Sequence, residues 1–272
     1  MKLLSSFPIL VLIIGALLSS CATVYSPNTP LTPIVEKGQL EVTAGGEMHG
    51  NAEVGAAWSP LPHLLLTGEM SYMIPTSEGS STTQGVTISA IDQQRQGSVG
   101  IGFYQGPTAT SATYWALIGG TGWGSRSFIA FDDYKASAYI PIPLPHQAGV
   151  FDAHYRRNYA QAYFAHPLWA KGMLGGLSLR SVYIDYTELT YNDHPIIGSN
   201  NFFVEPSFFL RYGKGCLRYY ATGGLSVPLG SETNNPANRW TTAEAPSQRI
   251  ASLSCIWGAG IIFRPDVLWH RK

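Results

Sequence analysis

Two long runs of alternating apolar and polar residues occupy positions 202–229, on either side of a tight turn predicted at Gly213-Lys214. In the first run the apolar residues share one face and the polar residues share the other: Val204, Phe208 and Leu210 against Glu205, Ser207 and Arg211. A period of two residues indicates β-strands. Each run holds ten or more residues, which exceeds the usual globular strand of about 5–6 and approaches the roughly 9–11 of a tilted membrane strand.

The same unit recurs along the chain and predicts ten strands, at 39–47, 52–58, 63–73, 95–104, 112–122, 154–164, 175–189, 202–212, 217–229 and 249–264. From the second strand onward the connections are alternately short and long, and the long ones include 74–94, 123–151 and 230–248. Outer-membrane barrels have short periplasmic turns and long outer loops. We therefore predict an all-β fold, a closed antiparallel up-and-down transmembrane β-barrel of about ten strands, with eight or twelve as alternatives. Both chain ends then lie on the periplasmic side.

Charged residues make up 12% of the chain, about half of the roughly 25% usual in soluble domains. A soluble barrel needs an outside coated with Lys and Glu, which this chain cannot supply. A membrane barrel needs an apolar outside and a small polar lumen, and the chain has both. The formal net charge is zero, which gives no reason to propose nucleic acid as a partner. We expect the partners to be outer-membrane lipids and the protein to be a monomer.

Five aromatic residues fall at the predicted periplasmic strand ends, where aromatic side chains mark a membrane edge: Trp58, Tyr104, Phe164, Tyr212 and Phe263. The segment 257–263 also resembles the last-strand signal read by the barrel assembly machinery, a glycine followed by spaced hydrophobic residues. The resemblance implies that this machinery is a partner during biogenesis. The tail at 265–272 departs from that signal, because it moves the aromatic residue away from the C-terminus.

Residues 1–20 have the features of an export signal, with Lys2, an apolar segment and small residues before Cys21. The sequence Leu-Ser-Ser-Cys at 18–21 resembles a bacterial lipobox, which implies that Cys21 is lipidated and becomes the first mature residue. The alternative is an ordinary signal peptide with a chance cysteine. Residues 21–38 contain three prolines and predict an extended, lipidated periplasmic tether without its own core. The barrel follows at 39–264, and the periplasmic tail at 265–272.

The start of the mature chain resembles a known group of lipoproteins. Cys21-Ala-Thr-Val-Tyr-Ser-Pro-Asn, with Pro30-Leu31 and the sequence Glu-Lys-Gly-Gln-Leu at 36–40, is similar to the start of Bacteroidota outer-membrane lipoproteins that look like small β-barrels. The resemblance covers roughly residues 18–58. Surface-exported lipoproteins of that phylum typically carry acidic residues just after the cysteine, whereas Ala, Thr and Val stand at 22–24 here. This departure implies an anchor in the periplasmic leaflet of the bacterial outer membrane, with the long loops extracellular.

Five charged residues lie on the polar faces of predicted strands, where a narrow barrel would bring them together: Glu53, Glu69, Glu205, Arg211 and Arg218. An arginine that faced lipid at the midplane would cost about 2–4 kcal/mol. Buried carboxylates are also costly unless they are paired. We predict a salt-bridge network that plugs the lumen, and the alternative is a narrow, selective pore for small solutes.

Asp152 and His154 are candidates for an acid/base pair at the outer rim, and Asp132-Asp133 lies in the preceding loop. The combination resembles omptin-like barrel proteases, which use an Asp/His pair and an acidic pair near the outer rim. A histidine beside an acid can serve as a general base; the alternative is a solvated rim.

Cys216 and Cys255 are expected as free thiols, because their positions along the two strands put them at different heights in the barrel. No metal spacing, P-loop or dinucleotide fingerprint is present, so we expect no cofactor.

The sequence thus predicts a lipid-anchored outer-membrane β-barrel with a structural or surface-interaction role and no enzyme activity. A rim hydrolase and a small-solute pore are the alternative functions.

Overall fold

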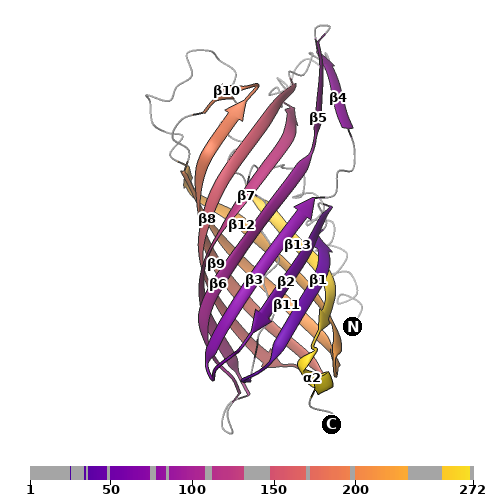
Figure 1. The fold of residues 1–272 in the computed structure, drawn as a ribbon, viewed down its shortest axis with the longest axis vertical. Helices are drawn as coiled ribbons and strands as arrows, with labels where there is room; N and C mark the ends of the chain where they lie inside the picture. The colour runs from indigo at the N-terminus through magenta and orange to yellow at the C-terminus, as the bar shows by residue number, and fades with distance from the viewer. Residues whose placement is uncertain are drawn as a thin grey trace, which may run out of the picture.

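The computed structural model describes residues 25, 34, 36–47, 50–73, 78–83, 86–107, 112–131, 148–169, 172–196, 200–231 and 253–269. Within this part of the chain, ten antiparallel strands form a closed barrel (Figure 1). They are β1 (Leu40–Glu47), β2 (Asn51–Trp58), β3 (Leu64–Met73), β6 (Gln93–Gln105), β7 (Tyr114–Phe131), β8 (Ala148–Pro167), β9 (Met173–Tyr191), β11 (Asn200–Lys214), β12 (Leu217–Ser231) and β13 (Ser254–Phe263). Each pairs with the next, and β1 pairs with β13 to close the ring. The predicted all-β closed barrel of ten strands is confirmed.

The two ends of the barrel differ. The lower end in Figure 1 carries the turn between β11 and β12 and the short helix α2 (Asp266–Trp269). The upper end carries the hairpin of β4 (Glu78–Thr83) and β5 (Val86–Ile91), and the short strand β10 (His194–Pro195), which pairs with β9. Among the described residues, no helix is long and apolar enough to cross a membrane.

Two predicted loops contain more strand than the pattern indicated. The hairpin β4–β5 lies within 74–94, while β7 continues to Phe131 and β8 starts at Ala148, both inside 123–151. In the extensions of β7 and β8 outward residues such as Ser125 and Ser127 are polar, whereas Phe128, Phe151 and Ala153 point inward. The apolar outer face that marks the other strands is therefore missing, although the backbone still pairs with its neighbours.

The turn predicted at Gly213-Lys214 lies two residues further along the chain. Lys214 pairs with Leu217, so the two-residue loop consists of Gly215 and Cys216. Gly215 has a φ of 74°, a left-handed conformation that glycine adopts without steric cost. The prediction relied on the glycine at position 213, but β11 and β12 continue to pair beyond this residue.

One side of the wall rises above the rest, as Figure 1 shows for β7, β8 and β9. The last pair between β3 and β6 is Tyr72 with Arg95, and Arg95 pairs in turn with Ser125 of β7. Above that level β7 runs six further residues to Phe131 (131 minus 125), or about 20 Å along the strand. The upper end therefore carries a projecting sheet on one side.

Side chains alternate between the two faces of the wall, as the pattern predicts. On β11, Phe208 and Leu210 are exposed on the outside, whereas Glu205, Ser207 and Arg211 are buried inside. Large exposed hydrophobic residues lie on β2, β3 and every later barrel strand: Val54, Met70, Val99, Leu117, Phe164, Leu179, Phe208, Tyr219 and Ile261. The outside of the barrel is therefore a broad apolar band.

Four of the five aromatic residues predicted at the lower edge are exposed on the outside: Trp58, Phe164, Tyr212 and Phe263. The prediction for Tyr104 was wrong. Its side chain is only 3% exposed, and its hydroxyl lies 2.9 Å from the Ser59 hydroxyl inside the barrel. Because side chains alternate along a strand, the neighbouring Phe103 takes the outward position.

Inside the barrel, tyrosine rings pack against the backbone of glycines on neighbouring strands. A Cβ added at Gly100 or Gly120 would overlap the Tyr159 side chain, and one at Gly124 would overlap Tyr155. Aromatic side chains laid over strand glycines stabilise register in sheets. The glycines of β6 and β7 thus make room for large side chains from β8, which fill the lumen.

Candidate functional site in the barrel lumen

Glu69 of β3 binds two arginines from across the lumen. Its Oε1 lies 2.6 Å from Nη2 of Arg180 on β9, and its Oε2 lies 2.8 Å from Nη2 of Arg157 on β8. All three side chains are buried. Because β6 and β7 separate β3 from β8 in the ring, these ion pairs bridge the interior instead of joining adjacent strands.

Neutral groups engage further donors of the two arginines. Arg180 donates from Nε and Nη2 to Gln161 Oε1 at 3.0 and 2.8 Å, and Arg157 Nη2 donates to the Ser98 hydroxyl at 3.1 Å. The Tyr159 ring lies 5.4 Å from Arg157 Cζ and 5.1 Å from Arg180 Cζ, within cation–π range. Removing a charge from water costs several kcal/mol per ion, and these contacts offset that cost.

A second carboxylate, Glu205 of β11, completes the charge balance at this level. The Ser226 hydroxyl donates to its Oε1 at 3.1 Å, and the charges of Arg180 and Arg157 act on it. Glu69, Glu205, Arg157 and Arg180 form what we call the central cluster. Its two carboxylates oppose two guanidinium groups, so the cluster carries no net charge.

A lower cluster lies near the start of β1. Arg211 Nη2 lies 2.8 Å from Glu41 Oε2, and Gln39 Nε2 donates to Glu41 Oε1 at 2.7 Å. Arg218 of β12 is half-buried and lies within electrostatic range of Arg211 and Glu41. Charge pairing therefore continues to the lower end of the lumen.

Arg264, just after β13, joins the two ends of the barrel chain. Its Nη2 lies 2.6 Å from Asp266 Oδ2 in α2 and 3.2 Å from Glu36 Oε1, which precedes β1. Burial disfavours the charged guanidinium, but the hydrogen bond and charge of Asp266 outweigh it, so the pKa of Arg264 lies above its ordinary value. This clamp fastens the chain beside the seam where β1 meets β13.

Near the upper end, Glu53 of β2 and Glu47 of β1 are close enough for their charges to act on each other. Asn51 Nδ2 donates to Glu47 Oε2 at 2.9 Å. Both carboxyl side chains are buried. This carboxyl pair is distinct from the ion pairs below it.

The five lumen residues predicted from sequence occupy three levels instead of one network. Glu53 belongs to the upper carboxyl pair, Glu69 and Glu205 belong to the central cluster, and Arg211 and Arg218 belong to the lower cluster. The structure brings each of them to the inside, but none forms an ion pair with another member of the predicted set among the described contacts.

Their partners were missed: Arg157, Arg180 and Glu41. A signal was available for Arg180, which alternates with the outward Leu179, and the same alternation places Glu41 inside. Arg157 was harder to find, because its outward neighbour Arg156 is also charged. The β8 pattern does not distinguish the inner from the outer face.

The predicted tether contributes two side chains to the lumen. Tyr25 is 1% exposed and Ile34 is fully buried. The Tyr25 ring lies 5.0 Å from that of Phe203 and 6.2 Å from that of Tyr155, and its phenol faces Glu205. The sequence predicts the segment 21–38 outside the barrel, but Tyr25 and Ile34 of this segment pack against the barrel interior. Cys21 lies outside the described residues.

Asp152 and His154 lie on the outer face of β8, in the projecting sheet. With Arg95 and Ser125 they line a polar hollow of about 190 Å³. Asp152 is half-buried and His154 is exposed, and within the described residues no hydrogen bond or ion pair joins their side chains. Asp132-Asp133 lies outside the described residues. The arrangement therefore shows no assembled acid/base pair.

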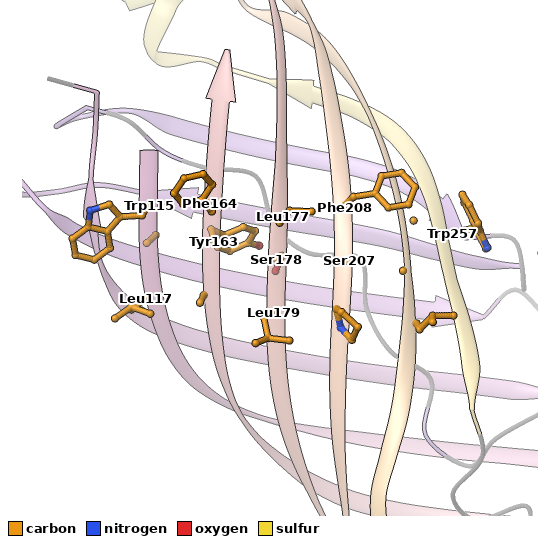
Figure 2. Close-up of a pocket in the computed structure, with 16 residues that line it drawn as sticks. Trp115, Leu117, Tyr163, Phe164, Leu177, Ser178, Leu179, Ser207, Phe208 and Trp257 are labelled. Atoms are coloured by element: carbon orange, nitrogen blue, oxygen red, sulfur yellow. The ribbon is translucent and has the colours of Figure 1, made fainter. Parts of the chain in front are cut away.

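A shallow groove of about 790 Å³ crosses the outside of β7, β8, β9, β11 and β12 (Figure 2). Trp115, Leu179 and Phe208 are among the exposed side chains at its sides, and Ala162 and Gly223 leave it open. Its lining is almost wholly apolar. Such a groove fits a hydrocarbon chain and offers little to a polar ligand.

The two cysteines in the described part of the chain are free thiols, as predicted: Cys216 is half-buried and Cys255 is buried. No group of three or more His, Cys, Asp or Glu side chains is arranged to hold a metal ion among the described residues.

Comparison with known proteins finds no family model that matches this sequence and no curated protein that is significantly similar to it.

Proposed function

We propose that this chain is a lipid-anchored β-barrel of the bacterial outer membrane, with a structural or surface-interaction role and a plugged lumen. The observation that carries the proposal is the combination of a closed ten-stranded wall with an apolar outside and ion pairs inside. Membrane barrels place apolar residues toward lipid and polar residues toward the lumen. The apolar groove on the outside, which fits an acyl chain, agrees with that placement.

The plug is the central cluster. Arg157, Arg180 and Glu69 are buried and meet across the lumen, so a solute that passed this level would have to break ion pairs that are shielded from water. Breaking a buried pair costs about 3–5 kcal/mol. We therefore assign a structural role in preference to the pore, and no catalytic role.

The surface role belongs to the upper end. The projecting sheet of β7, β8 and β9 and the hairpin β4–β5 lie there, and in the proposed orientation they face the outside of the cell. The lower end then faces the periplasm; the lipobox-like end at Cys21 and the resemblance to Bacteroidota lipoproteins support export of the chain into that compartment.

Conductance in planar bilayers tests the plug, with heat-modifiability on a gel as the check that the purified protein is folded. We expect folded protein to give no steady ionic current. A steady current from folded protein overturns the plug and favours the pore.

Epitope tags within 74–94 and 230–248 test the orientation. They should label on intact cells, and labelling only after permeabilisation overturns the proposed placement.

A further inference from the structure

We infer that the chain before β1 passes upward through the lumen, so that Cys21 leaves the barrel at the upper end, opposite the end where β1 begins. The inference rests on where Tyr25 and Ile34 lie. It takes the outer-membrane location and the lipidation of Cys21 from the proposed function, and it concerns which leaflet the lipid enters.

Ile34 lies at the lower end of the lumen. Its backbone is next to the Tyr114 hydroxyl, and Tyr114 is the first residue of β7, with its ring 6.2 Å from that of Tyr104 at the end of β6. Just after Ile34, the Arg264–Glu36 ion pair and a 2.7 Å hydrogen bond from Gly38 N to Ser59 O hold the chain at the lower rim.

Tyr25 lies at the upper end of the lumen. It packs against Tyr155 and Phe203, just above the central cluster. On the outside at this level, Phe202 pairs with Tyr183, and both rings are exposed. Exposed aromatic residues at one height are typical of a membrane–water interface. Tyr25 therefore lies level with the upper edge of the apolar band.

Residue spacing on β8 gives the distance between Tyr25 and Ile34 along the barrel axis. Ala165 pairs with Tyr114 and lies ten residues below Tyr155 (165 minus 155). Ten residues correspond to about 33 Å along a strand, or about 25 Å along the axis of a barrel tilted by about 40°. Nine residue steps separate Tyr25 from Ile34, and they reach about 32 Å at most. The chain is long enough to climb the lumen, with little length to spare.

Cys21 is four residue steps before Tyr25, which gives a reach of about 14 Å. The lower edge of an apolar band lies about 25 Å below its upper edge, which is beyond that reach. Lipid chains on Cys21 therefore reach the outer leaflet and not the periplasmic one. This replaces the leaflet expected from the absence of acidic residues after Cys21.

Photo-crosslinking tests the path of the chain. A diazirine phenylalanine at position 25 should form adducts with β11 and β8 fragments that contain Phe203 and Tyr155, and a photo-leucine at position 34 should form adducts with the fragment that contains Tyr114. Mass spectrometry of the folded protein in liposomes identifies the fragments. Adducts of position 25 with the Tyr114 fragment, or with no barrel fragment, overturn the inference.

Thiol labelling tests the exit, in a background with Cys216→Ser and Cys255→Ser. Thr23→Cys is compared with His194→Cys, which is exposed at the upper end, and with Lys37→Cys, which is exposed at the lower end. With an impermeant maleimide on cells, Thr23→Cys should label together with His194→Cys. If Thr23→Cys labels only under the condition that labels Lys37→Cys, or under neither condition, the proposed exit of the chain at the upper end is wrong. If His194→Cys requires permeabilisation and Lys37→Cys does not, the proposed orientation in the membrane is wrong. The inference is then still decided by whether Thr23→Cys labels together with His194→Cys or with Lys37→Cys.

Discussion

Glu69 and Arg180 are 111 residues apart in sequence and form a 2.6 Å ion pair across the barrel lumen. The pair spans from β3 to β9, and Arg157 of β8 occupies the other oxygen of the same carboxylate. Because β3 is a neighbour of neither β8 nor β9 in the wall, these contacts brace the barrel from inside.

The Glu69→Gln substitution should destabilise the barrel by about 3–5 kcal/mol, because it removes the carboxylate that forms ion pairs with two buried guanidinium groups. A double-mutant cycle with Arg180→Gln, read by urea unfolding in liposomes, should give a coupling energy of about 0.5–3 kcal/mol. The cycle of Glu69→Gln with Arg211→Gln is the control, since Arg211 belongs to the lower cluster; its effects should add within about 0.5 kcal/mol. Equal coupling in both cycles contradicts the separation into levels.

The Phe208→Arg substitution should cost about 2–4 kcal/mol, because it sets a cation against lipid midway along the wall. Tyr212→Arg, on the same face of β11 but at its lower end, should cost only about 0–1 kcal/mol. Both side chains are exposed on the outside, so a barrel surrounded by water predicts small and similar effects. Unfolding by urea in liposomes separates the two cases. A Tyr212→Arg loss equal to that of Phe208→Arg speaks against the proposed membrane placement.

The Gly120→Ala substitution should cost about 1–3 kcal/mol, because its Cβ would overlap the Tyr159 ring inside the barrel. Gly119→Ala is the matched control, since its nearest neighbour is a backbone oxygen at 4.0 Å; its effect should stay within about 0.5 kcal/mol. In a Tyr159→Ala background the extra cost of Gly120→Ala should disappear. If it persists there, the ring is not its cause.

The two thiols should react at different rates with a soluble alkylating reagent in the absence of reductant. Cys216 is half-buried at the lower turn and should be modified in the folded protein, whereas the buried Cys255 should react only after unfolding. Peptide mass spectrometry before and after urea measures both sites. A disulfide between them, or equal reaction in the folded state, contradicts the structure.

The sequence by itself determined the parts of the fold that depend on alternation. The period of two residues predicts the strands and the outward direction of Phe208, Val99 and Met70, because each side chain points opposite to its neighbour whatever the rest of the chain does. The same rule applied strictly would have placed Phe103 outside and Tyr104 inside. Chain closure followed from the number of strands and the alternating loop lengths.

Only the tertiary structure decided which inward residues meet. Alternation states that Glu69 and Arg180 point inward, but their contact depends on the curvature and stagger of the whole ring, which no local pattern encodes. Arg157 and the extensions of β7 and β8 were hidden because the outward residues beside them, such as Arg156 and Ser125, are polar and form no apolar outer face. The positions of Tyr25 and Ile34 lay beyond sequence reasoning for a related reason: a proline-rich segment has no periodicity of its own, and the space that receives its side chains exists only after ten strands have closed around it.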